Sequence, residues 1–462
     1  MTRELTVGLE VHVELETTTK MFCGCKNDPF NAEPNTHVCP VCYGLPGALP
    51  LLNKKAIEMT VGLGQALNGK IAPKTFWARK NYFYPDLPKG YQISQSTAPL
   101  VERASIVIEG QTHRITRIHL EEDAGKLTHD TQGKRSLVDY NRAGVPLLEM
   151  VTEPDFHTAE AAKHFCQELQ RLVRHLKISR ADMEKGQMRC EANISIAAAG
   201  AELGTKVEVK NLNSFRSVER AINYEFARQT KLLDEGKTVA QETRLWDEKK
   251  GETAVMRGKE TSADYRYFPE PDLPMVSISL GKATGSLVLP DEQRTRLAKL
   301  GMSEAIAKII VDRQEFDSIM ETYAASSKKF KDDDKVKFYT LEDGKMRAGL
   351  PKFSELNASD RLLLLEAKND QGWSKSMFES LVAQVLDGET AEKLVAARKG
   401  TSGDIDPEAV AQEVIKANPK ALADYKAGKV VALNFLVGQV MTRTKGQINV
   451  TVAQDTIRRL LG

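Results

Sequence analysis

Hydrophobic and polar residues alternate strictly near the start of the chain, at residues 8–14 (Gly-Leu-Glu-Val-His-Val-Glu). Successive side chains of a β-strand point to opposite faces, so Glu10, His12 and Glu14 are expected on one face and the aliphatic residues on the other. An ordinary surface strand also alternates, but the pattern recurs at residues 189–195 and 206–210. Several strands therefore have one apolar face and one face of carboxylate, amide and basic side chains. This pattern indicates a sheet whose polar face carries out chemistry, as in an enzyme.

Helical spacing of apolar residues predicts helices at 158–176 and 215–234, between strands that are often joined by short turns. This arrangement favours an α+β fold with a largely antiparallel sheet over a doubly wound fold. After Leu289-Pro290-Asp291-Glu292, which is typical of a helix start, the pattern is helical and poor in strands. A charged run at 326–337 is expected to be an exposed loop between two helices. The sequence thus predicts three domains: a sheet cradle at 1–290, a helical domain at 291–400 and, after a linker at 400–403, a small helical tail at 404–462.

Composition narrows the class of protein without naming a partner. The chain has 462 residues, 41% hydrophobic and 28% charged, as expected of a soluble globular protein. Its net charge is only +2, from 65 basic and 63 acidic residues. No apolar run approaches the roughly 20 residues that a membrane span needs, and the first residues enter a strand without a signal segment. A cytoplasmic protein that does not contact a membrane is therefore expected.

Four of the six cysteines lie close together in the sequence, as Cys23-Gly24-Cys25 and Cys39-Pro40-Val41-Cys42. A C-x-C and a C-x-x-C motif thirteen residues apart predict a tetrahedral thiolate site for structural Zn²⁺ in a knuckle at 23–42. Because four thiolates close the coordination shell, such a site leaves no position for a substrate. The alternative is a set of redox-active or merely buried thiols.

Four further stretches carry candidate chemistry. Basic residues beside aromatic ones at 79–86 suit an adenine and its phosphates, although a packed aromatic loop has the same composition. Three consecutive carboxylates at 121–123 are the oxygen ligands that hard divalent ions prefer. Glu149 stands inside an apolar strand, where a carboxylate costs several kcal/mol unless it is paired or coordinated. A proline-braced loop at 264–272 carries both charge signs.

Familiar catalytic and nucleotide-binding motifs are not found in the sequence. Gly236-Lys237-Thr238 resembles the end of a P-loop, but the earlier glycine position holds Lys231. Neither H-E-x-x-H nor G-x-S-x-G occurs. If the chain uses a nucleotide, an open sheet and metal ions are expected to hold it.

The end of the chain is basic. Residues 416–459 contain eight basic and two acidic residues, hence a net charge of +6. This charge favours contact with a phosphate backbone, and a solvated basic face is the alternative. The residues chosen as candidates for binding a nucleic acid are Lys426, Lys429, Arg443 and Lys445.

Several of these segments together resemble one family. The matching segments are 8–14, 79–86, 119–126, 139–149, 211–215 and 264–272, with 435–441 in the tail. They closely resemble the B-subunit family of the glutamyl/aspartyl-tRNA amidotransferases. The resemblance implies a kinase-like first domain related in fold to glutamine synthetase, a helical domain and a tail that grips tRNA. It also implies a heterotrimer in which an amidase subunit releases ammonia from glutamine and a small third subunit supports the pair.

The same resemblance implies the activity. In this family, ATP phosphorylates the side-chain carboxylate of Glu mischarged on tRNA(Gln), or of Asp on tRNA(Asn), and ammonia then displaces the phosphate. Which tRNA is used depends on the mischarged tRNAs that the cell makes. The alternative is a non-catalytic, zinc-containing scaffold that binds tRNA while other subunits carry out the chemistry.

The family pattern also assigns residues. It places the catalytic Mg²⁺ on Glu10, His12, Glu122 and Glu149, with Mn²⁺ expected to substitute because His12 is an unusual Mg²⁺ ligand. Residues assigned to the nucleotide or acyl phosphate are Lys80, Arg189 and Arg266. One point stays open, because strict alternation puts Glu122 on the apolar side of its strand. Either the strand ends before Glu122, or Glu121 is the ligand.

Overall fold

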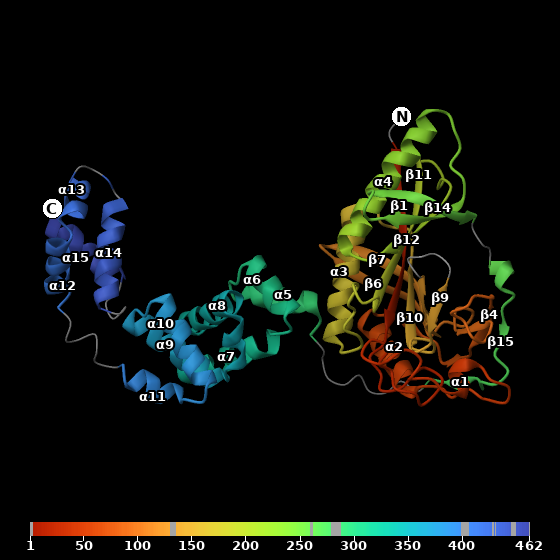
Figure 1. Ribbon diagram of the computed structural model, residues 1–462, viewed down its shortest axis with the longest axis horizontal. Helices are drawn as coiled ribbons and strands as arrows, with labels where there is room; N and C mark the ends of the chain where they lie inside the picture. Colours follow the sequence, from red (N-terminus) through yellow and green to blue (C-terminus); the bar gives the residue numbers. More distant parts are fainter. Residues whose placement is uncertain are drawn as a thin grey trace. The chain divides into compact units, whose positions relative to one another are not determined.

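The computed structural model describes residues 3–129, 135–258, 262–278, 288–398, 406–426, 429, 431–444 and 450–461. The chain divides into two compact units, Met1–Pro290 and Asp291–Gly462 (Figure 1). Their boundary coincides with the predicted start of the helical region, whereas the predicted linker at 400–403 lies outside the described residues. Among the described helices, none combines the length and the hydropathy needed to cross a membrane.

A twelve-stranded sheet forms the centre of the first unit. Its strand order is β14-β13-β12-β11-β1-β10-β7-β5-β4-β15, with β6 paired to β7 and β2 paired to β6. Among the described strands only β12 and β13 pair in parallel, so the predicted largely antiparallel sheet is confirmed. The strands are β1 (Arg3–Glu14), β2 (Lys70–Ile71), β3 (Lys74–Thr75), β4 (Ala78–Asn81), β5 (Tyr91–Ser94), β6 (Val101–Ile108), β7 (Gln111–Glu122), β8 (Lys126–His129), β9 (Ser136–Asp139), β10 (Pro146–Thr152), β11 (Met188–Ala198), β12 (Val207–Leu212), β13 (Glu242–Asp247), β14 (Glu252–Gly258), β15 (Phe268–Pro269) and β16 (Val276–Ser277).

One face of this sheet is apolar and covered by helices. The aliphatic residues of β1 that alternate with Glu10 and His12 are fully buried, in one core with apolar residues of α3 (Ala159–His175) and α4 (Phe215–Asp234) (Figure 1). Both helices lie where the sequence predicts them, and the hydroxyls of Thr158 and Ser214 cap their first turns. Since a fully buried large aliphatic side chain contributes about 1.5–3 kcal/mol, the alternation fixes which face of β1 turns inward.

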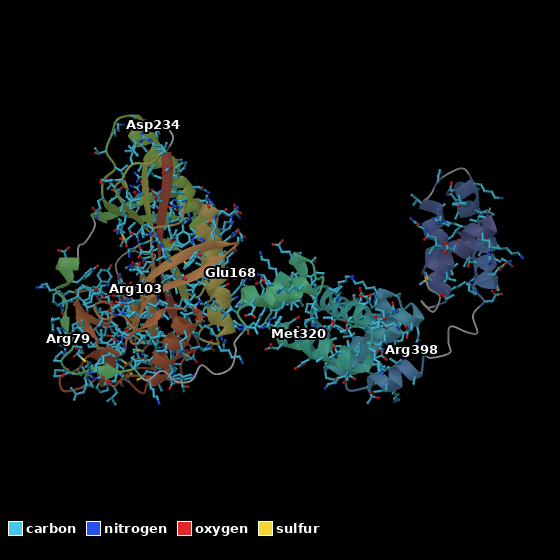
Figure 2. The ribbon with its side chains drawn as sticks, turned by 180° about the vertical axis from the view of Figure 1, so that it is seen from behind. Arg79, Arg103, Glu168, Asp234, Met320 and Arg398 are labelled. Atoms are coloured by element: carbon cyan, nitrogen blue, oxygen red, sulfur yellow. The ribbon has the colours of Figure 1, made fainter. Side chains whose placement is uncertain are left out.

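Polar contacts tie α4 to the sheet. The fully buried Glu225 accepts hydrogen bonds from Arg228, Gln229 and Thr253, at 2.5–2.9 Å. Burial by itself would raise the pKa of Glu225, but these hydrogen bonds outweigh it and lower the pKa. The end of α4, marked by Asp234 in Figure 2, accepts a hydrogen bond of 2.9 Å from Arg3 at the start of β1.

The cysteine-rich segment folds into a short knuckle. Its helix α1 (Pro40–Tyr43) begins after Cys39 and ends at Gly44, whose φ of 63° is in the left-handed region that glycine tolerates best. A Cβ at Gly44 would overlap Cγ of Lys89 and lie 3.2 Å from its Cα. Glycine at this position therefore permits both the turn and the close approach of Lys89. The remaining helices of the first unit are α2 (Lys54–Ala66) and the 3₁₀ turn η1 (Ser262–Tyr265).

The described part of the second unit is helical, as predicted. Two hydrophobic cores lie in it, one around Phe353, Leu364 and Phe378, the other around Leu436 and Val440. The loop predicted at 326–337 is wrong over most of its length, because α7 continues to Lys329 and α8 begins at Asp333. Lysines end the first of these helices and aspartates begin the second, which stabilises both helix dipoles. The elements are α5 (Pro290–Lys299), α6 (Glu304–Asp312), α7 (Phe316–Lys329), α8 (Asp333–Gly349), η2 (Pro351–Glu355), α9 (Ala358–Gln371), α10 (Lys375–Leu386), α11 (Ala391–Ala396), α12 (Pro407–Ala417), α13 (Pro419–Lys426), α14 (Val431–Arg443) and α15 (Val450–Leu461).

Candidate active site and metal sites

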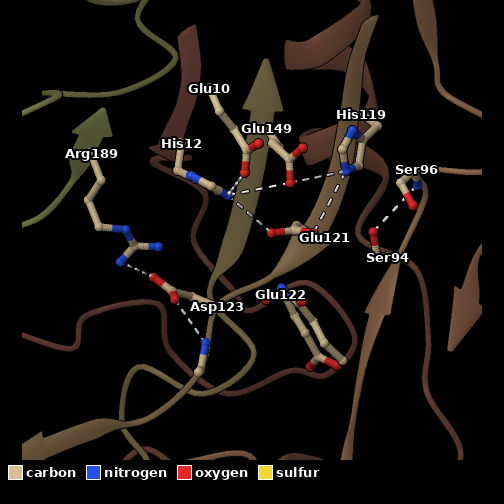
Figure 3. Close-up of polar contacts among 12 residues, drawn as sticks. Glu10, His12, Ser94, Ser96, His119, Glu121, Glu122, Asp123, Glu149 and Arg189 are labelled. Carbon is tan, nitrogen blue, oxygen red and sulfur yellow. Dashed lines mark hydrogen bonds and ion pairs between the residues drawn. The ribbon is translucent and has the colours of Figure 1, made fainter. Parts of the chain in front are cut away.

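The polar face of the sheet carries a row of charged and histidine side chains across four neighbouring strands (Figure 3). In the strand register, His12 of β1 lies opposite Glu149 of β10, and Glu149 lies opposite His119 of β7. On the other side of β1, His12 lies opposite Arg189 of β11. Because neighbouring strands are only about 4.8 Å apart, this register brings side chains from distant parts of the sequence into contact.

Five of these side chains form a compact cluster, called here the carboxylate–histidine cluster: Glu10, His12, His119, Glu121 and Glu149. His12 Nε2 lies 3.4 Å from the nearest carboxylate oxygen of Glu149, 3.7 Å from that of Glu121 and 3.9 Å from that of Glu10. On the other side, His119 Nε2 lies 3.6 Å from Glu149 Oε2 and 3.7 Å from Glu121 Oε2. Glu149 and Glu121 thus lie between the two imidazoles (Figure 3).

Burial and mutual charge perturb the titration of the cluster. Burial, then repulsion by Glu149 and Glu191, raises the pKa of Glu10 to about 7. Burial alone would lower the pKa of His12, but the contact with Glu149 and the charge of Glu10 raise it to about 9. Burial would raise the pKa of Glu149, yet the neighbouring histidines lower it. The carboxylates of the cluster therefore stabilise a positive charge placed beside them, as they do for His12.

The donor atoms of the cluster fit a divalent cation. Both ring nitrogens of His119 and Oε2 of Glu121 are buried without a hydrogen-bond partner among the described residues. A buried polar atom left unsatisfied costs about 1–3 kcal/mol, and metal coordination is one way to satisfy it. Two sets of three ligand atoms are close enough together to hold an ion, namely those of Glu10, His12 and Glu149 and those of His119, Glu121 and Glu149. Carboxylate oxygens are the ligands that Mg²⁺ and Mn²⁺ prefer.

Glu122 does not belong to this cluster. It follows Glu121 on β7, so its side chain turns to the opposite face, where its Oε1 accepts hydrogen bonds from the Ile93 backbone N–H (3.0 Å) and from Lys89 Nζ. Figure 3 shows it pointing away from the cluster. The expectation that Glu122 shares a site with Glu10, His12 and Glu149 is therefore corrected, because β7 runs through Glu122 and alternation places Glu121 on the polar face. His119 was not assigned a role from the sequence, although alternation with Glu121 was a signal for it.

The cationic residues assigned from the sequence fall into different surroundings. Lys80 lies at the cluster, where burial would lower its pKa but the charges of Glu121 and Glu149 raise it. Arg189 donates to Asp123 at 2.9 Å, close to the cluster. The side chain of Arg266 is exposed and makes no contact with the cluster within the described part of the chain, while its backbone carbonyl accepts a hydrogen bond of 2.8 Å from Asn81.

A loop that contains aromatic residues borders the cluster. Arg79 of β4 makes a bidentate contact with Glu270, with Nε and Nη2 donating at 2.7 and 2.9 Å to its two carboxylate oxygens. Lys80 lies 4.8 Å from the ring centre of Tyr265. The proline-braced loop predicted at 264–272 is thus held against β4 by the bidentate ion pair of Arg79 with Glu270 and by the cation–π contact of Lys80 with Tyr265.

The four cysteines of the knuckle converge on one point. The sulfur of Cys42 lies 3.4 Å from that of Cys23, 3.7 Å from that of Cys25 and 3.8 Å from that of Cys39. A tetrahedral metal site with metal–sulfur bonds of about 2.3 Å has sulfur–sulfur edges of about 3.8 Å, so these positions could hold one metal ion. The hydrogen bond with Cys23 and, next, the charge of Lys20 lower the pKa of the Cys42 thiol to about 4.

Several basic residues of the tail are already paired. Lys429 Nζ lies 2.9 Å from Asp424, and Arg443 Nη1 lies 3.5 Å from Glu413. Lys426 ends α13, and Lys445 lies outside the described residues. Glu413 lies just before residues 416–459, whose net charge is +6. The tail as a whole is therefore less positively charged than that segment alone.

Comparison with known proteins agrees with this architecture. Residues 5–282 match the GatB/GatE catalytic domain, and residues 352–461 match the GatB domain. The chain is 43% identical to the B subunit of the Aspartyl/glutamyl-tRNA(Asn/Gln) amidotransferase of Chlorobium chlorochromatii, with 100% of both chains covered. It is 44% identical to the protein of the same name from Thermus thermophilus, over 99% of this chain and 98% of that protein. The chain therefore belongs to the B-subunit family of the aspartyl/glutamyl-tRNA(Asn/Gln) amidotransferases.

Proposed function

We propose that this chain activates the side-chain carboxylate of Glu on tRNA(Gln), or of Asp on tRNA(Asn), for amidation. The γ-phosphoryl group of ATP passes to a carboxylate oxygen and leaves ADP. Ammonia then attacks the acyl phosphate, inorganic phosphate leaves, and the nitrogen loses a proton to give the amide. The observation that carries this proposal is the carboxylate–histidine cluster on the polar face of the sheet, in a chain whose relatives bear the name of this amidotransferase component.

The chemistry explains why such a cluster is needed. A carboxylate resists attack by ammonia because its oxygen is a poor leaving group, and phosphorylation supplies a good one. Transfer of a phosphoryl group between two anions requires cations that offset their repulsion. Mg²⁺, when bound, would neutralise phosphate charge and orient the phosphate oxygens.

The residues of the chain take separate parts in this proposal. Glu10, His12 and Glu149, with Glu121 in place of Glu122, would hold Mg²⁺. Lys80 supplies a fixed positive charge beside the cluster. Arg189, held by its ion pair with Asp123, and Arg266, exposed on the loop beside β4, are the proposed contacts for the nucleotide or acyl phosphate.

The resemblance to the same family supports proposals for the other cofactor and for the partners. The four cysteines are proposed to bind a structural Zn²⁺. An amidase subunit is proposed to supply ammonia, with a small third subunit completing a heterotrimer. The tail is proposed to contact tRNA through Lys426, Lys429, Arg443 and Lys445.

The activation step can be tested in the assembled complex. ADP release is measured with and without mischarged Glu-tRNA(Gln), omitting glutamine so that no ammonia is supplied. We expect ADP only with mischarged tRNA, and loss of ADP release in Glu149→Gln. Glu160→Gln, an exposed carboxylate on α3, is the matched control and should keep the wild-type rate. Tight tRNA binding without any ADP would favour the scaffold alternative.

Contact of the tail with tRNA has its own test. The affinity of the complex for tRNA is measured as a function of salt concentration for Lys426→Ala and Arg443→Ala. Each phosphate contact that is lost should reduce the salt slope by about 0.7–0.9. An unchanged slope would mean that these residues face only water.

A further inference from the structure

Lys20 is a fully buried lysine beside the cysteine knuckle. Its Nζ lies 3.6 Å from the sulfur of Cys42 and donates a hydrogen bond of 3.2 Å to the backbone carbonyl of Tyr140. Among the described residues, no carboxylate lies within ion-pairing distance of this ammonium group. Burying an ammonium ion is costly unless an anion or several acceptors receive its protons, so one carbonyl oxygen does not account for its position.

With a divalent ion bound, the anion that Lys20 would face is the set of four thiolates. Four thiolates around one divalent ion leave a net charge of −2 in a half-buried site. An ammonium group in contact with one of these sulfurs removes half of that excess charge and donates a charge-assisted hydrogen bond to the sulfur.

The backbone fixes Lys20 in this position. Its N–H donates to the Cys25 carbonyl at 3.0 Å, and its own carbonyl accepts a hydrogen bond of 3.2 Å from the side chain of Asn53. The next residue, Met21, donates from its N–H to the carbonyl of Gly144 at 2.7 Å. Lys20 is therefore part of the knuckle through its main chain and reaches the Cys42 sulfur through its side chain.

We propose that Lys20 is the counter-ion of the metal-bound thiolates, a positioning residue that holds Cys42 as a metal ligand and links the knuckle to the loop at 140–145. This inference rests on the Zn²⁺ site proposed above. It goes beyond that site because Lys20, which is not one of the four ligands, is proposed to contribute to the affinity for the metal. Groups that contact metal ligands in this way typically change metal affinity by about 10–100-fold when removed.

The test uses the full-length chain and Zn²⁺ alone as the probe. Transfer of Zn²⁺ to a chromogenic chelator is compared at neutral pH for wild type, Lys20→Met and Lys20→Gln. We expect both variants to hold Zn²⁺ about 10–100-fold more weakly. Lys26→Met is the matched control, because Lys26 follows Cys25 directly but is exposed and paired with Asp28. It should retain wild-type affinity.

Cobalt substitution gives a second readout that does not depend on affinity. A thiolate that has lost its ammonium partner gives up an electron more easily. The sulfur-to-cobalt charge-transfer band of Lys20→Gln should therefore move to lower energy than in wild type or Lys26→Met. If neither neutral variant folds, cobalt-loaded wild type labelled with ¹⁵N in its lysine side chains replaces them, and one ammonium signal should be shifted and broadened by the metal.

The outcomes separate this inference from the metal site on which it rests. A wild-type chain that binds neither Zn²⁺ nor Co²⁺ would overturn the metal site itself. A wild-type chain that binds Zn²⁺, together with a Lys20→Gln chain of equal affinity and unshifted band, would overturn only the role of Lys20. An absence of any metal-perturbed ammonium signal in the cobalt-loaded wild type would overturn it as well.

Discussion

Glu121 and Glu122 are neighbours in sequence but face opposite sides of β7, and this predicts opposite phenotypes for two conservative substitutions. Glu121→Gln removes one of the three carboxyl groups of the carboxylate–histidine cluster and leaves the opposite face untouched. Glu122→Gln leaves the cluster intact and removes the charge that pairs with Lys89. We expect the first change to weaken binding of a divalent ion and the second to reduce stability.

The expected sizes follow from the surroundings of the two residues. Two unit charges 4 Å apart interact by about 4 kcal/mol at the effective dielectric of about 20 that suits sites near a protein surface. The attraction between a carboxylate and a divalent ion is twice as large. In the variant, water and the amide oxygen of the glutamine replace part of this lost attraction. We therefore expect Glu121→Gln to weaken Mn²⁺ binding at least about 100-fold, or about 2.7 kcal/mol. Glu122 and Lys89 have only 4% and 9% of their side chains exposed, so breaking their pair should cost about 3 kcal/mol.

Both effects are measurable on the purified chain. Calorimetric titration with Mn²⁺ gives the metal affinity, and urea unfolding of the metal-free chain gives the stability. Glu121→Gln should lower the urea midpoint less than Glu122→Gln does, because Glu149 still faces Lys80. Glu122→Gln should bind Mn²⁺ with wild-type affinity once it is folded. The reverse pattern, with metal affinity lost in Glu122→Gln and kept in Glu121→Gln, would refute the assignment of the two faces.

Three further predictions concern other parts of the first unit. A Cys39→Ser/Cys42→Ser chain should contain no stoichiometric Zn²⁺ by elemental analysis, and retained Zn²⁺ would contradict the four-sulfur site. Glu225→Gln should be less stable than wild type at neutral pH, because the fold lowers the pKa of Glu225 below its ordinary value of 4.5. That contribution is complete above pH 4.5 and is lost as the pH falls through the lowered pKa, so unfolding curves of the two proteins should converge in acid and a constant gap would refute the account. Arg79→Lys should lower stability by about 1–3 kcal/mol in urea unfolding, since lysine does not reproduce the bidentate contact with Glu270, and an unchanged midpoint would mean that the loop is held by other contacts.

Much of the first unit could be predicted because apolar and polar residues alternate in its strands, and because Thr158 and Ser214 cap its two long helices. Alternation predicts Glu10 and His12 on one polar face, and the cost of burying a lone carboxylate in an apolar strand singles out Glu149. Alternation also argues against Glu122, which the family pattern assigns as a ligand. The family pattern identifies the segment 119–126 as part of the site. The two-residue period of a strand shows which of its side chains face the site. Where the two disagreed, the strand period was the better guide, because β7 continues without interruption through Glu122.

What could not be predicted depends on contacts between distant segments. Alternation with Glu121 puts His119 on the polar face of β7, but its proximity to His12 depends on β10 lying between β1 and β7, a strand order that no local pattern contains. The position of Lys20 against Cys42 likewise arises only once the knuckle has closed. The composition of the charged run at 326–337 predicts a loop, but the order of its charges fits two helix ends, because basic residues at a helix end and acidic residues at a helix start stabilise helices.

The register of the sheet has a consequence for folding. Sliding β10 by one residue along β1 would put Leu148 or Met150 opposite His12 and turn Glu149 toward the apolar side. The cluster needs β1, β7 and β10 aligned at once, so a chain with correct helices and a misaligned sheet would lack it. A divalent ion that requires all three strands would thus bind only correctly registered molecules. Mn²⁺ binding would then measure the fraction of correctly registered molecules in a refolding sample. Helix content alone would not distinguish these molecules from misaligned ones.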